Sequence, residues 1–179
     1  DELMIDPVKV ISVASHDTAS AVAAVPSTER DTVYISCGTW SLFGTELDEP
    51  NTSDEARESN LTNEGGCQGK IRFLKNIMGT WLIQQSRRYW NRQGHNLSYD
   101  DLEQMANACT PFQSVVDVDD SVFLAPGDTP VRIQEYCRKT NQPVPQSIGE
   151  IMQCIYCSIA LRYRYTFDSL KKITGKEYT

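Results

Sequence analysis

A carboxylate and a Gly-Thr pair follow two strand-like segments near the start of this chain, and they are the residues best suited to chemistry. Asp17 lies in Ser15-His16-Asp17-Thr18, directly after an apolar run at residues 8–14, and Gly38-Thr39 follows a second apolar run at residues 32–36. Polar turns at neighbouring strand ends form the mouth of an open α/β sheet, where ligands usually bind. A carboxylate at one end and a turn able to approach a phosphate at the other indicate phosphoryl transfer.

Each of these features also has an ordinary structural explanation. Asp17 could merely cap the helix expected to start at Thr18, because Asp accepts orphan backbone N–H groups there. As a general base it would instead take a proton from an attacking hydroxyl, which requires a rigid, partly dry position aimed at the substrate. Gly38-Thr39 could be a plain hairpin turn, whereas a phosphate site would use the glycine for close backbone approach and the hydroxyl and N–H groups as donors.

Two further polar features are weaker. Gly65-Gly66 is a dipeptide found in many ordinary turns. Asn76 and Gln84 are eight residues apart, a little over two turns of the helix expected to begin near Asn76, so both side chains could face one cleft. None of these signals is specific by itself.

Composition and charge narrow the function classes. The 179 residues, 40% of them hydrophobic, are enough for one ordinary domain with its own core. A net charge of −7 disfavours a nucleic-acid partner, which would require clustered Lys and Arg. No segment approaches the roughly 18 apolar residues of a membrane span, and no secretory signal opens the sequence. The first residue is not Met, and both ends look like cuts, so we expect a piece of a larger cytoplasmic protein.

The cysteines and histidines do not have the spacing of a metal site. Only Cys154 and Cys157 form a C-x-x-C pair, and it lies in a strongly helical pattern with no second pair. Zinc sites normally place such a pair on a turn and need two more ligands, and neither His16 nor His95 is suitably spaced from a cysteine. We therefore predict no metal site built from cysteines and histidines, and six reduced thiols, at Cys37, Cys67, Cys109, Cys137, Cys154 and Cys157.

The pattern along the chain predicts an α/β fold with one continuous core, β-rich at the start and helical afterwards. In the first part of the chain we expect a strand at 8–14, a short helix at 18–24, and strands at 32–36 and 40–47 that form a hairpin at Gly38. A surface loop with a helical turn at 48–60, a turn at 62–66 and a strand at 70–74 should follow. Helices are expected from about residue 76, after the capping box Ser98–Asp101, at Thr129-Pro130, and after Ser147–Glu150. The last and longest carries an apolar stripe and should lie across one face of the sheet.

Four segments together resemble the FGGY carbohydrate kinase family. They are residues 14–22, 38–42, 62–66 and 74–82, and the resemblance runs over essentially the whole chain in order. It implies an actin-like, ribonuclease-H-like ATPase fold, in which sugar and ATP bind between two domains. Residues 1–179 would correspond to part of the second, C-terminal domain. The N-terminal domain of the same polypeptide and the final adenosine-binding segment would lie outside this chain.

The same resemblance implies roles for individual residues. Asp17 would be the catalytic base with His16 and Thr18 beside it at the sugar, Gly38 and Thr39 would bind the nucleotide phosphates, and Asn76 and Gln84 would lie on the nucleotide side. The implied reaction uses ATP and Mg²⁺ to convert a ketose, L-rhamnulose first of all, to its 1-phosphate, and the chain alone is expected to be inactive. The alternatives are a kinase for another sugar such as L-fuculose, or a non-catalytic sugar-sensing relative, against which the presence of both Asp17 and Gly38-Thr39 argues.

Overall fold

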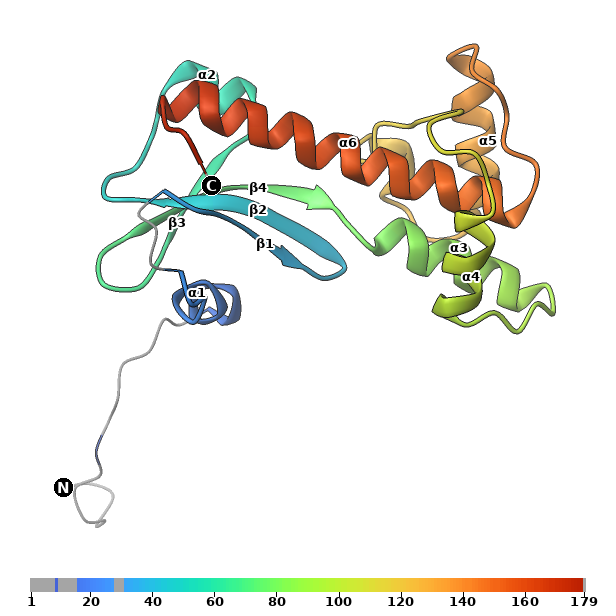
Figure 1. Ribbon diagram of the computed structural model, residues 1–179, viewed down its shortest axis with the longest axis horizontal. Coiled ribbons are helices and arrows are strands. Elements are labelled where there is room, and N and C mark those ends of the chain that lie inside the picture. Colours follow the sequence, from blue (N-terminus) through green and yellow to red (C-terminus); the bar gives the residue numbers. More distant parts are fainter. Residues whose placement is uncertain (1–8, 10–15, 28–30, 179) are drawn as a thin grey trace.

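The computed structural model describes residue 9 and residues 16–27 and 31–178, so the strand expected at 8–14 lies outside the described residues except for Lys9. A four-stranded sheet and a group of helices share one long helix that runs over both (Figure 1). The elements in chain order are α1 (Asp17–Ala23), β1 (Val33–Cys37), β2 (Trp40–Leu47), α2 (Asp54–Glu58), β3 (Thr62–Gly65), β4 (Ile71–Met78), α3 (Trp81–Arg92), α4 (Tyr99–Asn107), the 3₁₀ turn η1 (Ser121–Phe123), α5 (Thr129–Lys139) and α6 (Ile148–Thr174).

The sheet has the order β1-β2-β4-β3, and every described pair in it is antiparallel. The strands expected at 32–36 and 40–47 are confirmed as β1 and β2, and the Gly38-Thr39 turn joins them as a hairpin. The N–H of Gly38 closes that turn by donating to the carbonyl oxygen of Trp40 at 2.9 Å. The turn is therefore held at one end of the sheet by the strands that flank it.

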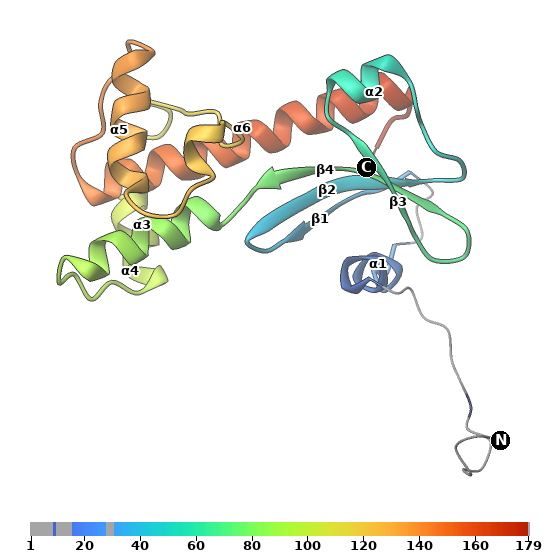
Figure 2. The same cartoon turned by 180° about the vertical axis from the view of Figure 1, so that it is seen from behind.

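Helices cover the two faces of the sheet differently. The C-terminal half of α6 lies over one face, as expected, and α1 lies on the opposite side (Figures 1 and 2). Ser41 and Phe43 of β2 point toward α6, where the Phe43 ring packs edge-on against the Tyr163 ring at 5.9 Å between centroids. Because side chains alternate between the two faces along a strand, one face of β2 packs against α6.

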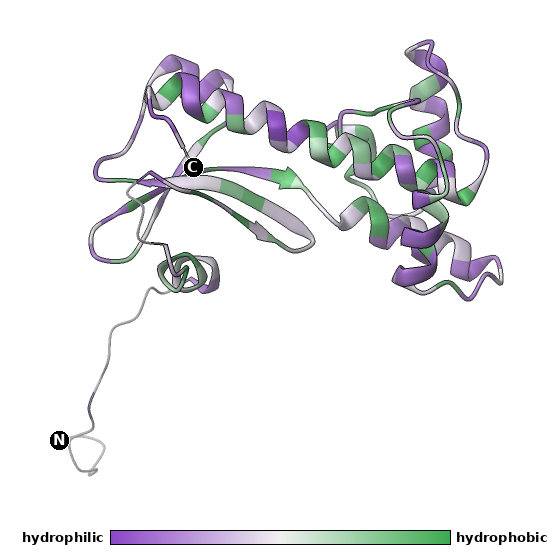
Figure 3. Cartoon of the chain, viewed as in Figure 1, coloured by the Kyte–Doolittle hydropathy of each residue, from purple (hydrophilic) through white to green (hydrophobic). Residues whose placement is uncertain are grey.

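The N-terminal half of α6 packs against α4, and α3 and α5 complete a helical layer. The approach to α4 is close, because a β-carbon on Gly149 would lie 2.4 Å from the Met105 carbonyl oxygen. Hydrophobic residues are concentrated where these helices meet (Figure 3), and most of the buried apolar side chains form one cluster from Phe43 and Phe73 of the sheet to Ile133 and Met152 of the helices. The single continuous core is confirmed.

Local sequence signals locate most helix starts. The capping boxes Ser98–Asp101 and Ser147–Glu150 are both formed, with side chain and backbone bonded reciprocally. The short helical turn in the 48–60 loop is α2. α5 begins at Thr129, with Asp128 rather than Thr129 at its N-cap and Pro130 in its first turn.

Two expectations are wrong. Thr62–Gly65 is not a turn but the edge strand β3, because it pairs with β4 and Glu64 forms a 2.9 Å ion pair with its cross-strand partner Arg72. No helix begins near Asn76, since residues 71–78 pair with β2 along their whole length. Side chains on both faces of β4 are buried, so its apolar residues do not alternate and its sequence looks helical.

Candidate nucleotide-phosphate site

The Gly38-Thr39 turn meets the start of α3 at the end of the sheet. The Thr80 hydroxyl donates to the carbonyl oxygen of Gly38 at 2.8 Å, and the Thr80 N–H donates to the same oxygen at 3.2 Å. The N–H of Trp81 donates to the carbonyl oxygen of Thr39 at 3.2 Å. Three hydrogen bonds thus hold the hairpin turn against the first residues of the helix.

Gln84 connects the side chains of this cluster. Its amide Nε2 donates to Thr80 Oγ1 at 3.1 Å and more weakly to Thr39 Oγ1 at 3.4 Å. Thr80 occupies the N-cap of α3 but makes no side-chain cap bond, because its hydroxyl is used on the turn. The positive end of the α3 dipole therefore faces the turn without a side-chain cap, which favours a negatively charged ligand there.

Gly38 and Thr39 are both exposed. A β-carbon on Gly38 would meet only the Trp40 carbonyl oxygen at 3.5 Å, an ordinary contact, so packing within the described part of the chain does not require glycine there. A bare backbone beside an exposed hydroxyl and a helix N-terminus suits close approach by a phosphate. These residues fit the nucleotide phosphates expected from the sequence.

The structure separates Asn76 from Gln84. Asn76 lies in β4 opposite Leu42, not on a helix with Gln84, and the spacing argument that placed both on one helix is wrong. Asn76 is exposed, and alternation along the strand places it on the sheet face away from α6. Gln84 reaches the turn through its hydrogen bond to Thr39 Oγ1.

His16, Asp17 and Thr18 lie at the start of α1, on the other side of the sheet from α6. Asp17 Oδ1 accepts the N–H of Thr18 at 2.7 Å and lies 3.3 Å from His16 Nδ1. The Asp17 side chain is 95% exposed, so the described residues do not supply the partly dry position that a general base requires. Thr18 is buried, with 8% exposure, so only the other two present their side chains at this surface.

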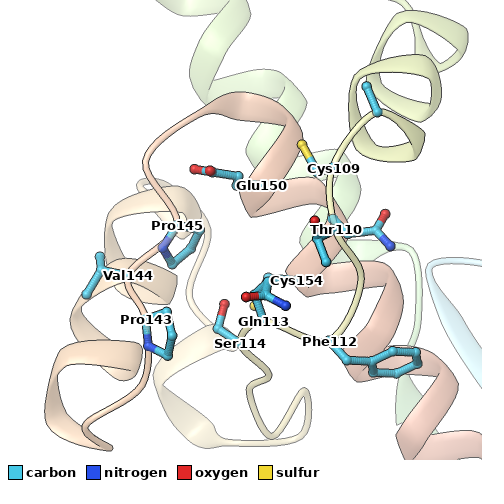
Figure 4. Close-up of a pocket in the computed structure, with 12 residues that line it drawn as sticks. Cys109, Thr110, Phe112, Gln113, Ser114, Pro143, Val144, Pro145, Glu150 and Cys154 are labelled. Carbon is cyan, nitrogen blue, oxygen red and sulfur yellow. The ribbon is translucent and has the colours of Figure 1, made fainter.

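A separate pocket of about 440 Å³ lies between the loop after α4, the loop before α6 and the first turns of α6 (Figure 4). Glu150 lines it, but this carboxylate already accepts the N–H groups of Gln146 and Ser147, which hold its pKa below the usual range. The pocket shares no lining residue with the Gly38-Thr39 turn. Its carboxylate is occupied by helix capping, and we assign the pocket no role in the chemistry.

All six cysteine thiols are free, three of them buried in the helical layer at Cys137, Cys154 and Cys157. Within the described residues, no group of three or more His, Cys, Asp or Glu side chains is arranged to hold a metal ion. No helix in the described part of the chain has the length and apolar character to cross a membrane.

Sequence reasoning missed residues that the geometry brings to the site. Thr80 carried a usable signal, because it precedes the helix within the segment 74–82 that resembles the kinase family. Ser41 lies in the segment 38–42 and carried the same kind of signal, but Tyr163 carried none: its hydroxyl oxygen is 2.6 Å from that of Ser41 although 122 residues separate them in the chain. Such long-range contacts leave no local pattern.

Residues 33–179 match the C-terminal domain of the FGGY family of carbohydrate kinases, and the chain belongs to this family. The match begins at Val33, the first residue of β1, so α1 and Asp17 precede it. The family membership expected from the four segments is confirmed.

The chain is similar to curated rhamnulokinases over most of its length. It is 47% identical to the rhamnulokinase of Bacteroides thetaiotaomicron over 94% of this chain and 34% of that protein. It is 48% identical to that of Enterococcus faecalis and 43% identical to that of Bacillus subtilis, again over 94% of this chain. The chain thus spans about a third of the length of these relatives.

A solved structure of xylulose kinase from Bifidobacterium adolescentis matches the fold. The TM-score is 0.54 at 15% sequence identity, covering 85% of this chain and 28% of that one. At this identity the likeness supports the fold alone. The chain is a C-terminal domain of the carbohydrate kinase family, with an antiparallel sheet followed by helices.

Proposed function

We propose that this chain supplies the nucleotide-phosphate site and the catalytic base of an ATP-dependent ketose kinase, whose substrate is L-rhamnulose. The family match supports a carbohydrate kinase, and identity of 43–48% to three rhamnulokinases supports the sugar. Because the chain spans about a third of those relatives, an N-terminal domain of the same polypeptide is proposed to complete the cleft.

The observation that carries the proposal is the docking of the Gly38-Thr39 turn on α3. Thr80 fixes the turn through the Gly38 carbonyl, and Gln84 orients the Thr39 hydroxyl. In this arrangement, Thr39 would donate to a phosphate oxygen of ATP, and the α3 dipole would favour the negative charge. Mg²⁺ bound with the nucleotide would neutralise part of the phosphate charge.

Asp17 is proposed to orient and deprotonate the primary hydroxyl of the sugar, with His16 beside it. Its full exposure here is consistent with a base that becomes enclosed only when the other domain and the substrate cover it. Phosphoryl transfer relies mainly on positioning and electrostatics, so this alignment of hydroxyl and phosphate is the essential task. Asn76, on the strand beside the turn, is proposed to lie on the nucleotide side of the cleft.

The test is a coupled assay on the complete polypeptide that carries this sequence, with ATP and a panel of L-rhamnulose, L-fuculose and L-xylulose. L-rhamnulose should give the highest kcat/KM. Thr39→Val, which removes the hydroxyl at nearly constant volume, should raise KM for ATP by about three- to tenfold, the usual effect of losing one hydrogen bond. Thr52→Val, at an exposed position in the loop before α2, is the matched control and should change nothing.

Three outcomes would contradict parts of the proposal. Higher kcat/KM on another ketose would correct the sugar and leave the kinase intact. An unchanged KM for ATP in Thr39→Val would remove Thr39 from the site. Sugar or ATP binding with no turnover on any ketose would indicate the non-catalytic alternative.

A further inference from the structure

Two adjacent residues of α6 hold the two strand ends from which the nucleotide-phosphate site is built. Tyr163 contacts the start of β2, and Arg162 contacts the end of β4 through an aspartate. Those two strand ends are neighbours in the sheet, because Ser41 pairs with Ile77 and Trp40 with Met78. The turn precedes the first strand end and α3 follows the second.

On the first side, the Tyr163 hydroxyl lies 2.6 Å from the Ser41 hydroxyl oxygen and 3.8 Å from the sulfur of Cys37. Ser41 is fully buried, and its hydroxyl also lies 3.6 Å from the Cys37 sulfur. Cys37 and Ser41 are the last antiparallel pair before the hairpin turn. Tyr163 therefore connects the end of β1 and the start of β2, which flank the turn, to the long helix α6.

On the second side, Arg162 binds Asp119 with 2.6 Å from Nε to Oδ2. The other carboxylate oxygen of Asp119 accepts the backbone N–H of Met78 at 2.8 Å. The side chains of Arg162 and Asp119 are 21% and 19% exposed, so this is a partly buried, charge-assisted link. Met78 is followed by Gly79 and then by Thr80, whose hydroxyl donates to the Gly38 carbonyl oxygen of the turn.

We propose that Tyr163 and the Arg162–Asp119 pair are positioning residues for the nucleotide-phosphate site, an inference that rests on the proposed function. Together they set the separation between the turn and the start of α3, and so the distance between Thr39 and Gln84. Neither group is required to touch the nucleotide. Loosening either link should misplace the Thr39 hydroxyl and weaken the use of ATP, while leaving the sugar side of the cleft unchanged.

The test compares two variants with two controls in the complete polypeptide. Tyr163→Phe keeps the ring contact with Phe43 and removes the hydroxyl. Asp119→Asn keeps the shape and removes the charge of the nearer of the two carboxylates paired with Arg162, the other being Asp117 at 3.8 Å. Tyr165→Phe, on an exposed ring two residues along α6, is the control for the first. Asp168→Asn, in an exposed pair with Arg164, is the control for the second.

Each of the two variants should raise KM for ATP by about three- to tenfold, with KM for the sugar within about twofold of wild type. Both controls should match wild type in both constants. Thermal melting identifies a folding defect, and if Tyr163→Phe fails to fold, Asp119→Asn decides.

The inference is overturned if KM for ATP stays unchanged in both variants, if KM for ATP and KM for the sugar rise by the same factor, or if neither variant folds. In all three cases an active wild type keeps the kinase proposal standing. A wild type that phosphorylates no ketose removes the proposed function, and this inference with it.

Discussion

Gly79 lies so close to Ser41 that a β-carbon on the glycine would sit 2.3 Å from the serine hydroxyl oxygen. The same β-carbon would be 3.2 Å from the carbonyl oxygen of Gly38. Since Ser41 is fully buried and bonded to Tyr163, it has no room to move aside. The residue between β4 and Thr80 must therefore be small for the turn to dock on α3.

Gly79→Ala should destabilise the fold and impair the site together. Inserting a methyl group into this packed contact should cost about 1–3 kcal/mol of unfolding free energy and raise KM for ATP. Gly65→Ala is the control, because a β-carbon at Gly65 meets nothing within 4 Å. Chemical denaturation and the coupled assay measure the two effects, and equal stability of the two variants would show that the contact relaxes freely.

The capping box at the start of α6 should contribute measurably to stability. Ser147 accepts the N–H of Glu150 at 3.2 Å, and the Glu150 carboxylate accepts the N–H of Ser147 at 2.9 Å. Ser147→Ala should lower the unfolding free energy by about 1 kcal/mol. Ser169→Ala, later in the same helix, removes a hydroxyl that donates to the Tyr165 carbonyl oxygen and should be neutral or slightly stabilising. Urea unfolding of both variants separates capping from a general effect of removing a serine from α6.

Local chemistry in the sequence was enough to predict β1, β2, the hairpin between them and the caps of α4 and α6. Each depends on residues within a few positions of one another, such as Ser98 and Asp101. β3 was missed because its polar residues become a strand only by pairing with β4, where Glu64 meets the buried Arg72. The β3 strand therefore depends on a pairing partner in another segment of the chain, which no local sequence pattern can indicate.

The candidate site was predictable in part for the same reason. Gly38-Thr39 could be selected from its own residues, and Gln84 does contact Thr39, although the helix argument that linked Gln84 to Asn76 was wrong. The residues that hold the turn in place were not predictable. Tyr163 lies 126 positions beyond Cys37, and only the packing of α6 over the sheet brings them together.

The stability of the fold should fall at alkaline pH because of a buried thiol. Burial raises the pKa of Cys154 to about 12, although a hydrogen bond with Ser114 opposes the shift. The contribution is fully present below the unfolded pKa of about 8.5 and is lost as pH rises toward about 12, at a limiting slope of about 1.4 kcal/mol per pH unit. This follows because the unfolded thiol releases its proton while the folded thiol keeps it.

Denaturant unfolding at a series of pH values above 8.5, roughly the free thiol's pKa, measures this dependence. Cys154→Ala should make the decline shallower than in wild type. Equal slopes in wild type and Cys154→Ala would contradict the assignment. Burial raises the pKa of Cys137 as well, so some alkaline dependence should persist in the Cys154 variant.

The role of Asp17 can be decided by one substitution, because its two possible roles predict opposite outcomes. Asp17 Oδ1 accepts the N–H of Thr18, and an asparagine there keeps an acceptor of the same shape. If the residue only supports the start of α1, Asp17→Asn should be nearly silent, since Asn suits helix starts about as well as Asp. If it is the general base, the amide cannot take the proton from the sugar hydroxyl.

In the complete polypeptide, Asp17→Asn should therefore lower kcat by about 10²–10⁴, equivalent to roughly 3–5 kcal/mol of barrier, with the fold and KM for ATP nearly unchanged. Asp54→Asn is the matched control, because Asp54 is another exposed aspartate in the first turn of a short helix. It should keep full activity. A kcat for Asp17→Asn within about threefold of wild type on L-rhamnulose would exclude Asp17 as the base, since loss of a positioned base costs at least about a hundredfold. The proton would then have to be accepted by another group.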